Sequence, residues 1–114
     1  MSDAVIRLHR TAQACRHDDR STSRTARLLR SGRSKIAKKF ADEAVEVVID
    51  AVHGDRDAII NDSADLIYNL VVLWISVDVH PEVVWKEIDR REQRLSISKK
   101  VPKKPPNRQG RFGD

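Results

Sequence analysis

The stretch KIAKKFADEAVEVVIDAVHGDRDAIINDSADLIYNLVVLW, residues 35–74, decides the fold of this 114-residue chain. Apolar residues recur at intervals of three and four on both sides of Gly54, which is typical of amphipathic helices. Gly54 favours the left-handed conformation that ends a helix, and Asp55 is suited to cap the next helix. The stretch therefore predicts two long helices, over about 34–53 and 56–77, joined by a tight turn.

Weaker helical patterns flank this pair. Apolar residues at helical spacing predict a first short helix over about 5–15. Ser23 is a candidate N-cap for a helix over 24–30. Pro81 suits the first turn of a helix over about 80–94. Strand-like alternation is scarce and there is no internal repeat, so the predicted fold class is all-α, a bundle of four to five helices.

The composition excludes several classes of protein. The chain is 39% hydrophobic and 34% charged, which does not fit collagen-like, disulfide-stapled or low-complexity chains. Its longest nearly apolar run, 66–77, is shorter than the roughly 20 residues of a membrane span. The sequence shows no basic stretch followed by an apolar segment at its start, so we expect no signal peptide. The lone Cys15 cannot form an internal disulfide, so we expect a cytoplasmic protein without a membrane span.

The segment 66–77 also predicts a partner. It is apolar on nearly every face, and a helix of that kind needs neighbours on all sides. Four or five helices, several of them short, scarcely cover it. The sequence therefore predicts a homodimer that buries the remaining face.

The net charge of +5 is unevenly distributed. Residues 1–39 carry +8, residues 40–95 carry −8, and residues 96–114 carry +5. Three prolines in the last segment forbid a continuing helix, so we expect one domain over 1–95 and a flexible basic tail over 96–114. Because Phe112 is its only aromatic residue, a solubilising tail is favoured over one that contacts nucleic acid.

Carboxylates gather in the acidic middle. Glu43 and Glu46 are three residues apart and share a helix face, as do Asp62 and Asp65 on the next helix. Glu46 and Asp62 each lie eight residues from the turn glycine, and Glu43 and Asp65 each lie eleven away. At about 1.5 Å of rise per residue, each pair is level across an antiparallel hairpin. Asp50 falls on the same face, so four carboxylates converge at two heights if the faces meet.

Converging carboxylates repel one another unless they are protonated, splayed into water or bound to a cation. Ligands that are all oxygen suit Mg²⁺ or Mn²⁺ rather than zinc. Such a site fits hydrolysis of a phosphoanhydride, in which metal ions neutralise phosphates and activate water. The alternative interpretation is a solvated acidic helix face.

Basic residues stand nearby. Lys39 and Lys35 continue the face of Glu43 one and two turns earlier, respectively, and Lys38 neighbours it. These lysines are candidates to bind phosphates as point charges. An ordinary salt bridge between Lys39 and Glu43 is the alternative.

Residues 35–74 resemble the core of the phosphoribosyl-ATP pyrophosphohydrolase family, within the all-α NTP pyrophosphohydrolase (MazG-like) superfamily. The upstream segment TSRTARLLRSGRSKIAKK, residues 22–39, is also similar to that family. The resemblance covers about residues 20–95. It rests on the acid quartet, the HGDR turn at 53–56 and the ADLIYNL run at 64–70, which occur in register.

This resemblance implies a site and a reaction. The superfamily has an EExxE motif and then ExxD, which bind Mg²⁺; here they read DEAVE from Asp42 and DSAD from Asp62. By resemblance, Glu43, Glu46, Asp62 and Asp65 are metal ligands, with Asp42 flanking them. The implied reaction hydrolyses the α–β bond of phosphoribosyl-ATP to phosphoribosyl-AMP and pyrophosphate, the second step of histidine biosynthesis. Lys35, Lys38, Lys39 and Arg27 are the implied phosphate-binding residues.

The sequence departs from the family at several positions. Asp42 and Asp62 stand where the family usually has Glu, which shortens each side chain by about 1.5 Å. Asn69 stands where it often has His. The first hypothesis is the family reaction, with Glu43 or Glu46 taking the proton of the attacking water. The alternatives are a housecleaning (d)NTP pyrophosphohydrolase and a helical dimer without catalytic activity.

Overall fold

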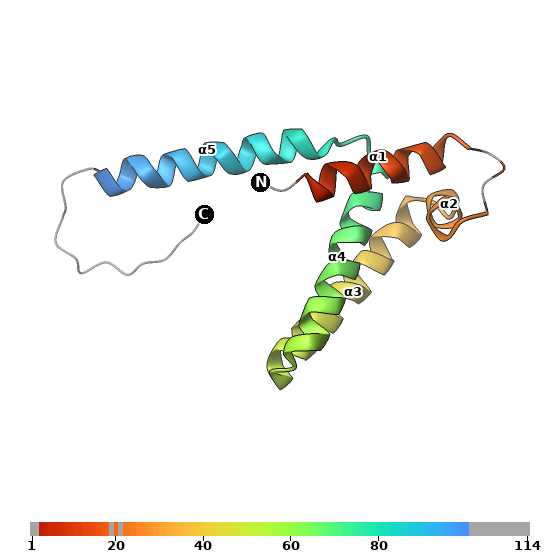
Figure 1. Cartoon of the computed structure of the whole chain (residues 1–114), viewed down its shortest axis with the longest axis horizontal. Helices are drawn as coiled ribbons and strands as arrows, with labels where there is room; N and C mark the ends of the chain where they lie inside the picture. The colour runs from red at the N-terminus through yellow and green to blue at the C-terminus, as the bar shows by residue number, and fades with distance from the viewer. Residues whose placement is uncertain (1–2, 19, 21, 101–114) are drawn as a thin grey trace. The chain divides into compact units, whose positions relative to one another are not determined.

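The computed structural model describes residues 3–18, 20 and 22–100, with only the backbone for 97–100. The chain divides into two compact units, Met1–Val84 and Trp85–Asp114. The described residues form five helices and no strand (Figure 1), which confirms the all-α class. The helices are α1 Ala4–Arg16, α2 Arg24–Arg30, α3 Arg33–His53, α4 Arg56–Ser76 and α5 Pro81–Lys100.

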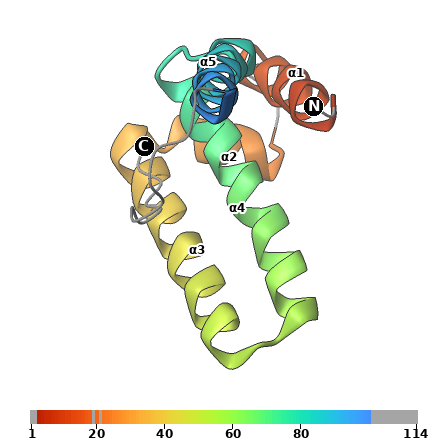
Figure 2. The same ribbon diagram turned by 90° about the vertical axis from the view of Figure 1, so that its left-hand side faces the viewer.

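Helices α3 and α4 form an antiparallel hairpin and run side by side over their length (Figure 2). Gly54 ends α3 with a φ of 68°, in the left-handed region where a side chain would be strained. Its N–H donates to the carbonyl of Ala51 at 3.1 Å. The side chain of Asp55 then caps α4 by accepting from the N–H of Ala58 at 3.1 Å. The predicted turn and cap are therefore confirmed.

The hydrophobic core lies at the end of the hairpin away from Gly54, where α1 packs against α4 (Figure 2). Its buried residues are Ala12 of α1 with Val71 and Ile75 of α4. Partly buried neighbours complete the cluster: Val5, Leu8, Leu29 and Trp74. The 3.6-residue periodicity that predicted these helices has placed one stripe of α1 on one stripe of α4.

One arginine ties α1 to the end of α4. The guanidinium of Arg16 donates to the carbonyl of Ile75 at 2.9 Å and pairs with the carboxylate of Asp78 at 3.0 Å. The first contact adds a donor to a carbonyl of the last turn of α4, which also accepts from the N–H of Asp78, and the second neutralises the Asp78 carboxylate. Arg16 therefore fixes α1 at the core end of the hairpin.

The hairpin leaves large apolar side chains exposed on both sides of Gly54, between Val45 on α3 and Ile67 on α4. We call this set the apolar turn face: Val45, Val48, Ile49, Val52, Ile60 and Ile67. By length and composition, α4 is also long and apolar enough to cross a membrane. The sequence-based expectation rested only on the apolar run 66–77, which is too short for a membrane span. The whole helix is long enough and apolar enough even though it contains Asp62 and Asp65.

Helix α5 is longer than predicted, because it continues to Lys100 instead of ending near Arg94. No glycine or proline interrupts it before Pro102. On its surface Glu87 accepts hydrogen bonds from Arg90 at 2.6 Å and from Arg91 at 3.0 Å. The part of the expected basic tail after residue 100 lies outside the described residues.

Candidate metal and phosphate site

Carboxylates meet where α3 faces α4. One carboxylate oxygen each from Glu43, Asp62 and Asp65 lie within 4.8 Å of one another. Glu46, Asp50 and Asp62 form a second group of the same kind. Each pair predicted to be level across the hairpin is therefore brought together, and Asp62 belongs to both groups. We call the five residues the acid cluster.

Asp50 shows how crowded the acid cluster is. Its pKa is raised to about 6, first because of a hydrogen bond with the Asp62 carboxylate, which requires a shared proton. Burial and repulsion from Asp62, Glu46 and Asp55 raise it further. When both carboxylates are ionised, the buried Oδ2 of Asp50 has no hydrogen-bond partner. Either a proton or a cation is needed to satisfy this oxygen.

The ligand chemistry of the acid cluster fits a hard divalent cation. All its donors are carboxylate oxygens, the ligand type that Mg²⁺ and Mn²⁺ prefer, and it contains no imidazole or thiolate of the kind that binds zinc. The shorter Asp62 still reaches both groups, so the missing methylene does not prevent convergence. Asp50 lies on the acidic helix face predicted from the sequence, but the predicted set of ligands does not include it. The signal that could have included it was its spacing of four residues from Glu46.

Asp42 lies apart from the acid cluster. Its carboxylate pairs with the ammonium of Lys38 at 2.9 Å, and both side chains are exposed. Asp42 instead borders a neighbouring hollow lined mostly by cations. Asp42 is adjacent to Glu43 in the sequence, but its carboxylate does not belong to the acid cluster.

This basic hollow has a volume of about 560 Å³ and lies between α2 and α3. All four predicted phosphate-binding residues line it, and so does Arg24, which the sequence interpretation missed. Its lining residues are Arg24, Arg27, Leu28, Ser31, Lys35, Lys38, Lys39 and Asp42. Five cationic side chains against one carboxylate give the hollow an excess of positive charge, which suits an anionic ligand.

The basic hollow and the acid cluster adjoin at one ion pair. The ammonium of Lys39 lies 3.4 Å from the Glu43 carboxylate, and the Glu43 side chain is mostly buried. The salt bridge given as the alternative for Lys39 is therefore present, while the same residue also lines the hollow. The carboxylates of the acid cluster and the cationic side chains of the hollow consequently lie side by side along α3.

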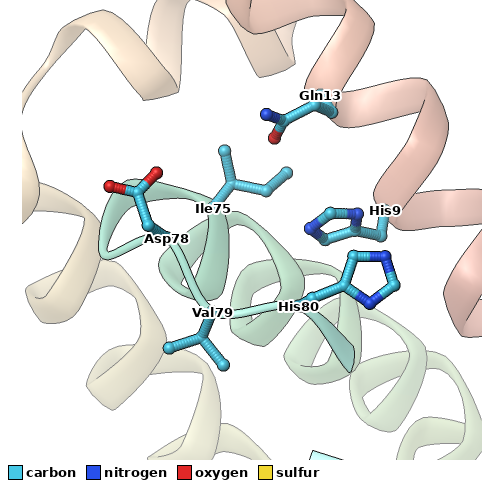
Figure 3. Close-up of a pocket in the computed structure, with 6 residues that line it drawn as sticks. All are labelled: His9, Gln13, Ile75, Asp78, Val79 and His80. Atoms are coloured by element: carbon cyan, nitrogen blue, oxygen red, sulfur yellow. The ribbon is translucent and has the colours of Figure 1, made fainter. Parts of the chain in front are cut away.

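A second, smaller pocket of about 180 Å³ lies between α1 and the α4–α5 connection (Figure 3). His9 and His80 meet there edge to face, with ring centroids 4.7 Å apart. The Nδ1 of His80 accepts a hydrogen bond from the N–H of Glu82 at 3.1 Å. Burial, and then the charge of His80, lower the pKa of His9.

The fold and site together define a class of protein, an all-α helical hairpin in which a carboxylate cluster adjoins a basic hollow. A family model described as phosphoribosyl-ATP pyrophosphohydrolase matches residues 5–92. The chain belongs to this family.

Named relatives agree with the family match. The chain is 58% identical to phosphoribosyl-ATP pyrophosphatase 2 of Bradyrhizobium diazoefficiens, over 90% of this chain and 77% of the relative. It is 56% identical to the protein of that name in Rhodopseudomonas palustris, over 90% and 79%. It is 45% identical to phosphoribosyl-ATP pyrophosphatase of Azospirillum brasilense, over 91% and 95%.

Proposed function

We propose that this chain hydrolyses the α–β phosphoanhydride of phosphoribosyl-ATP to phosphoribosyl-AMP and pyrophosphate, the second step of histidine biosynthesis. The observation that carries the proposal is the adjacency of the acid cluster and the basic hollow at the Lys39–Glu43 pair. The names of the relatives support phosphoribosyl-ATP as the substrate.

The acid cluster is proposed to hold Mg²⁺, with Mn²⁺ also suitable, through Glu43, Glu46, Asp62 and Asp65. Asp50 completes the set, because its buried oxygen otherwise lacks a partner. A cation bound there supplies charge neutralisation for the phosphates and a lowered pKa for the attacking water.

The cations of the basic hollow bind and orient the substrate phosphates in this proposal. Arg27, Lys35 and Lys38 line the hollow, and Lys39 stands where it meets the acid cluster. Charge-assisted hydrogen bonds from these groups hold the reacting phosphate at the edge of the carboxylates. Water then attacks that phosphorus, one of its protons passes to a carboxylate, and pyrophosphate leaves.

Glu46 is the proposed acceptor of the water's proton. Glu43 is held in an ion pair with Lys39, which favours a structural or ligand role for it. Glu46 is exposed and makes no ion pair among the described residues. A carboxylate that pairs with no lysine or arginine and is open to solvent keeps one oxygen available to receive a proton from water, even when its other oxygen binds a cation.

The apolar turn face is proposed to be covered by a second copy of the chain. Val52 and Val48 on α3 are 79% and 60% exposed, and Ile60 on α4 is 55% exposed. A homodimer removes this surface from water. It also makes α4 a core helix and not a membrane span, because Asp62 and Asp65 at its middle are costly in a bilayer. We propose a soluble, cytoplasmic protein without a membrane partner, in which a solubilising role of the basic tail is favoured over contact with nucleic acid.

The test is pyrophosphate release from phosphoribosyl-ATP beside a panel of NTPs and dNTPs, with and without Mg²⁺. We expect Mg²⁺-dependent turnover of phosphoribosyl-ATP alone. Turnover of NTPs instead would move the protein to the housecleaning class, and no turnover of any compound would favour the non-catalytic dimer.

Two matched variants assign the base. Glu46→Gln is expected to lower kcat by about 10²–10⁴-fold. Asp57→Asn serves as the control, because Asp57 is an exposed acid in the first turn of α4 outside the acid cluster. If Glu43→Gln lost kcat while Glu46→Gln kept it, the role of base would pass to Glu43.

A further inference from the structure

Tyr68 connects α4 to the start of α2. Its hydroxyl oxygen lies 2.6 Å from the Oγ1 of Thr25 on α2. The guanidinium carbon of Arg24 lies 5.9 Å from the centroid of the Tyr68 ring. Two consecutive residues of α2 are thereby held by one side chain of α4, through a hydrogen bond and a cation–π contact.

Arg24 belongs to the lining of the basic hollow, where neither the sequence patterns nor the resemblance placed it. Its helix has only seven residues, too few to be stable without tertiary contacts. Ser23 caps it by accepting from the N–H of Ala26 at 3.1 Å. That cap fixes the first turn of α2 but does not orient the arginine, and the ring of Tyr68 is what the Arg24 guanidinium meets.

Tyr68 also stands three residues beyond Asp65 and six beyond Asp62 on the same helix. A side chain that contacts α2 from this position sets the distance between the Arg24 side chain and the acid cluster. An arginine stacked on a ring samples fewer rotamers than a free one, so it binds an anion at a smaller entropic cost.

We propose that Arg24 is a further anion-binding residue of the basic hollow and that Tyr68 is the positioning residue that fixes it there. The identity of the anion, a phosphate group of phosphoribosyl-ATP, rests on the proposed function. The ring of Tyr68 orients the guanidinium, and its hydroxyl holds the helix that carries Arg24 by binding Thr25. The geometry assigns no role in proton transfer to either residue.

The test measures KM and kcat for phosphoribosyl-ATP in the full chain. Arg24→Gln is expected to raise KM about tenfold with little change in kcat, the signature of lost substrate binding. Tyr68→Leu removes both contacts and is expected to raise KM about three- to tenfold. Tyr68→Phe keeps the ring beneath Arg24 and should raise KM less. Thr25→Val removes the same hydrogen bond from the other side and should match Tyr68→Phe.

A double-mutant cycle separates positioning from general packing. If Tyr68 acts through Arg24, Tyr68→Leu has no further effect on KM in the Arg24→Gln background. Additive effects of the two substitutions, or an unchanged KM in Arg24→Gln, would overturn the proposal. Because Tyr68→Phe preserves the apolar packing, it supplies the comparison if Tyr68→Leu fails to fold.

Arg30→Gln is the matched control. Arg30 lies on the same short helix but lines a different hollow with Cys15 and Asp18, so its removal should leave KM unchanged. Calorimetric binding of inorganic tripolyphosphate provides a readout that does not need turnover. If the wild type fails to hydrolyse phosphoribosyl-ATP while Arg24→Gln and Tyr68→Leu weaken tripolyphosphate binding, the proposed function fails and this inference stands. If the wild type is active but neither substitution affects binding or KM, the inference alone is wrong.

Discussion

The two ends of the α3–α4 hairpin differ in how well their apolar and charged side chains are satisfied within the chain. At the end near α1, Ile75 is 1% exposed and Val71 is fully buried against the neighbouring helix. Between the middle of the hairpin and Gly54, Val52 is 79% exposed and carboxylate oxygens lie within 4.8 Å of one another. The first end is satisfied within the chain. The second end leaves apolar surface and like charges, which a second copy and a cation would satisfy, and we infer that it is built for both.

Removing apolar packing from the core end is expected to have the largest effect. Ile75→Ala should lower the free energy of unfolding by about 2–5 kcal/mol, because it leaves a cavity between α1 and α4. Chemical denaturation monitored by circular dichroism measures this change. The comparison predicts the same loss with and without Mg²⁺, and a loss that disappeared on adding Mg²⁺ would contradict it.

Removing one charge from the turn end should affect activity strongly and stability in the opposite direction. Asp62 belongs to both carboxylate groups, so Asp62→Asn is expected to lower kcat by about a hundred- to a thousandfold. The same change relieves repulsion, so thermal unfolding of the metal-free variant should occur at a higher temperature than that of the wild type. A lower unfolding temperature would show that the carboxylates do not repel one another in the folded chain.

The apolar turn face provides the next test. Val48→Asp places a charge on a surface that is 60% exposed in the single chain, so the monomer should tolerate it. In a two-fold dimer the change occurs twice, and the dissociation constant should rise by about a hundredfold or more. Analytical ultracentrifugation measures the shift. Val83→Asp is the control, because Val83 is 64% exposed on α5 and outside the turn face. Equal association in both variants would show that the chain does not dimerise through the apolar turn face.

Helix α5 shows a third way of stabilising a helix, and its test has the smallest expected effect. Hydrogen bonds from Arg90 and then Arg91 lower the pKa of Glu87 from 4.5 to about 2. Because the pKa is depressed on folding, the stabilisation is present above about pH 4.5 and is lost as the pH falls towards 2. An NMR titration of the Glu87 carboxyl should show a midpoint near 2 that moves up in Arg90→Gln. A midpoint unchanged by this substitution would exclude the ion pair.

Local signals in the sequence predicted the helix ends well. Gly54, Asp55 and Ser23 act through backbone conformation and hydrogen bonds within four residues, so their roles are confirmed where the pattern placed them. The level pairs of carboxylates followed from equal spacing about one glycine. The basic hollow could be anticipated only in part, because Arg24 reaches it through a contact with Tyr68, which is far away in the sequence. No local pattern encodes such a tertiary contact.

The most direct test uses isothermal titration calorimetry to measure Mn²⁺ binding to the metal-free wild type and to Asp62→Asn. Asp57→Asn is the control. We expect saturable binding by the wild type and by Asp57→Asn, and little or no binding by Asp62→Asn. Near pH 6, binding to the wild type should also release the proton that Asp50 and Asp62 share. Equal Mn²⁺ binding by all three proteins would contradict the claim that the turn end of the hairpin is a cation site.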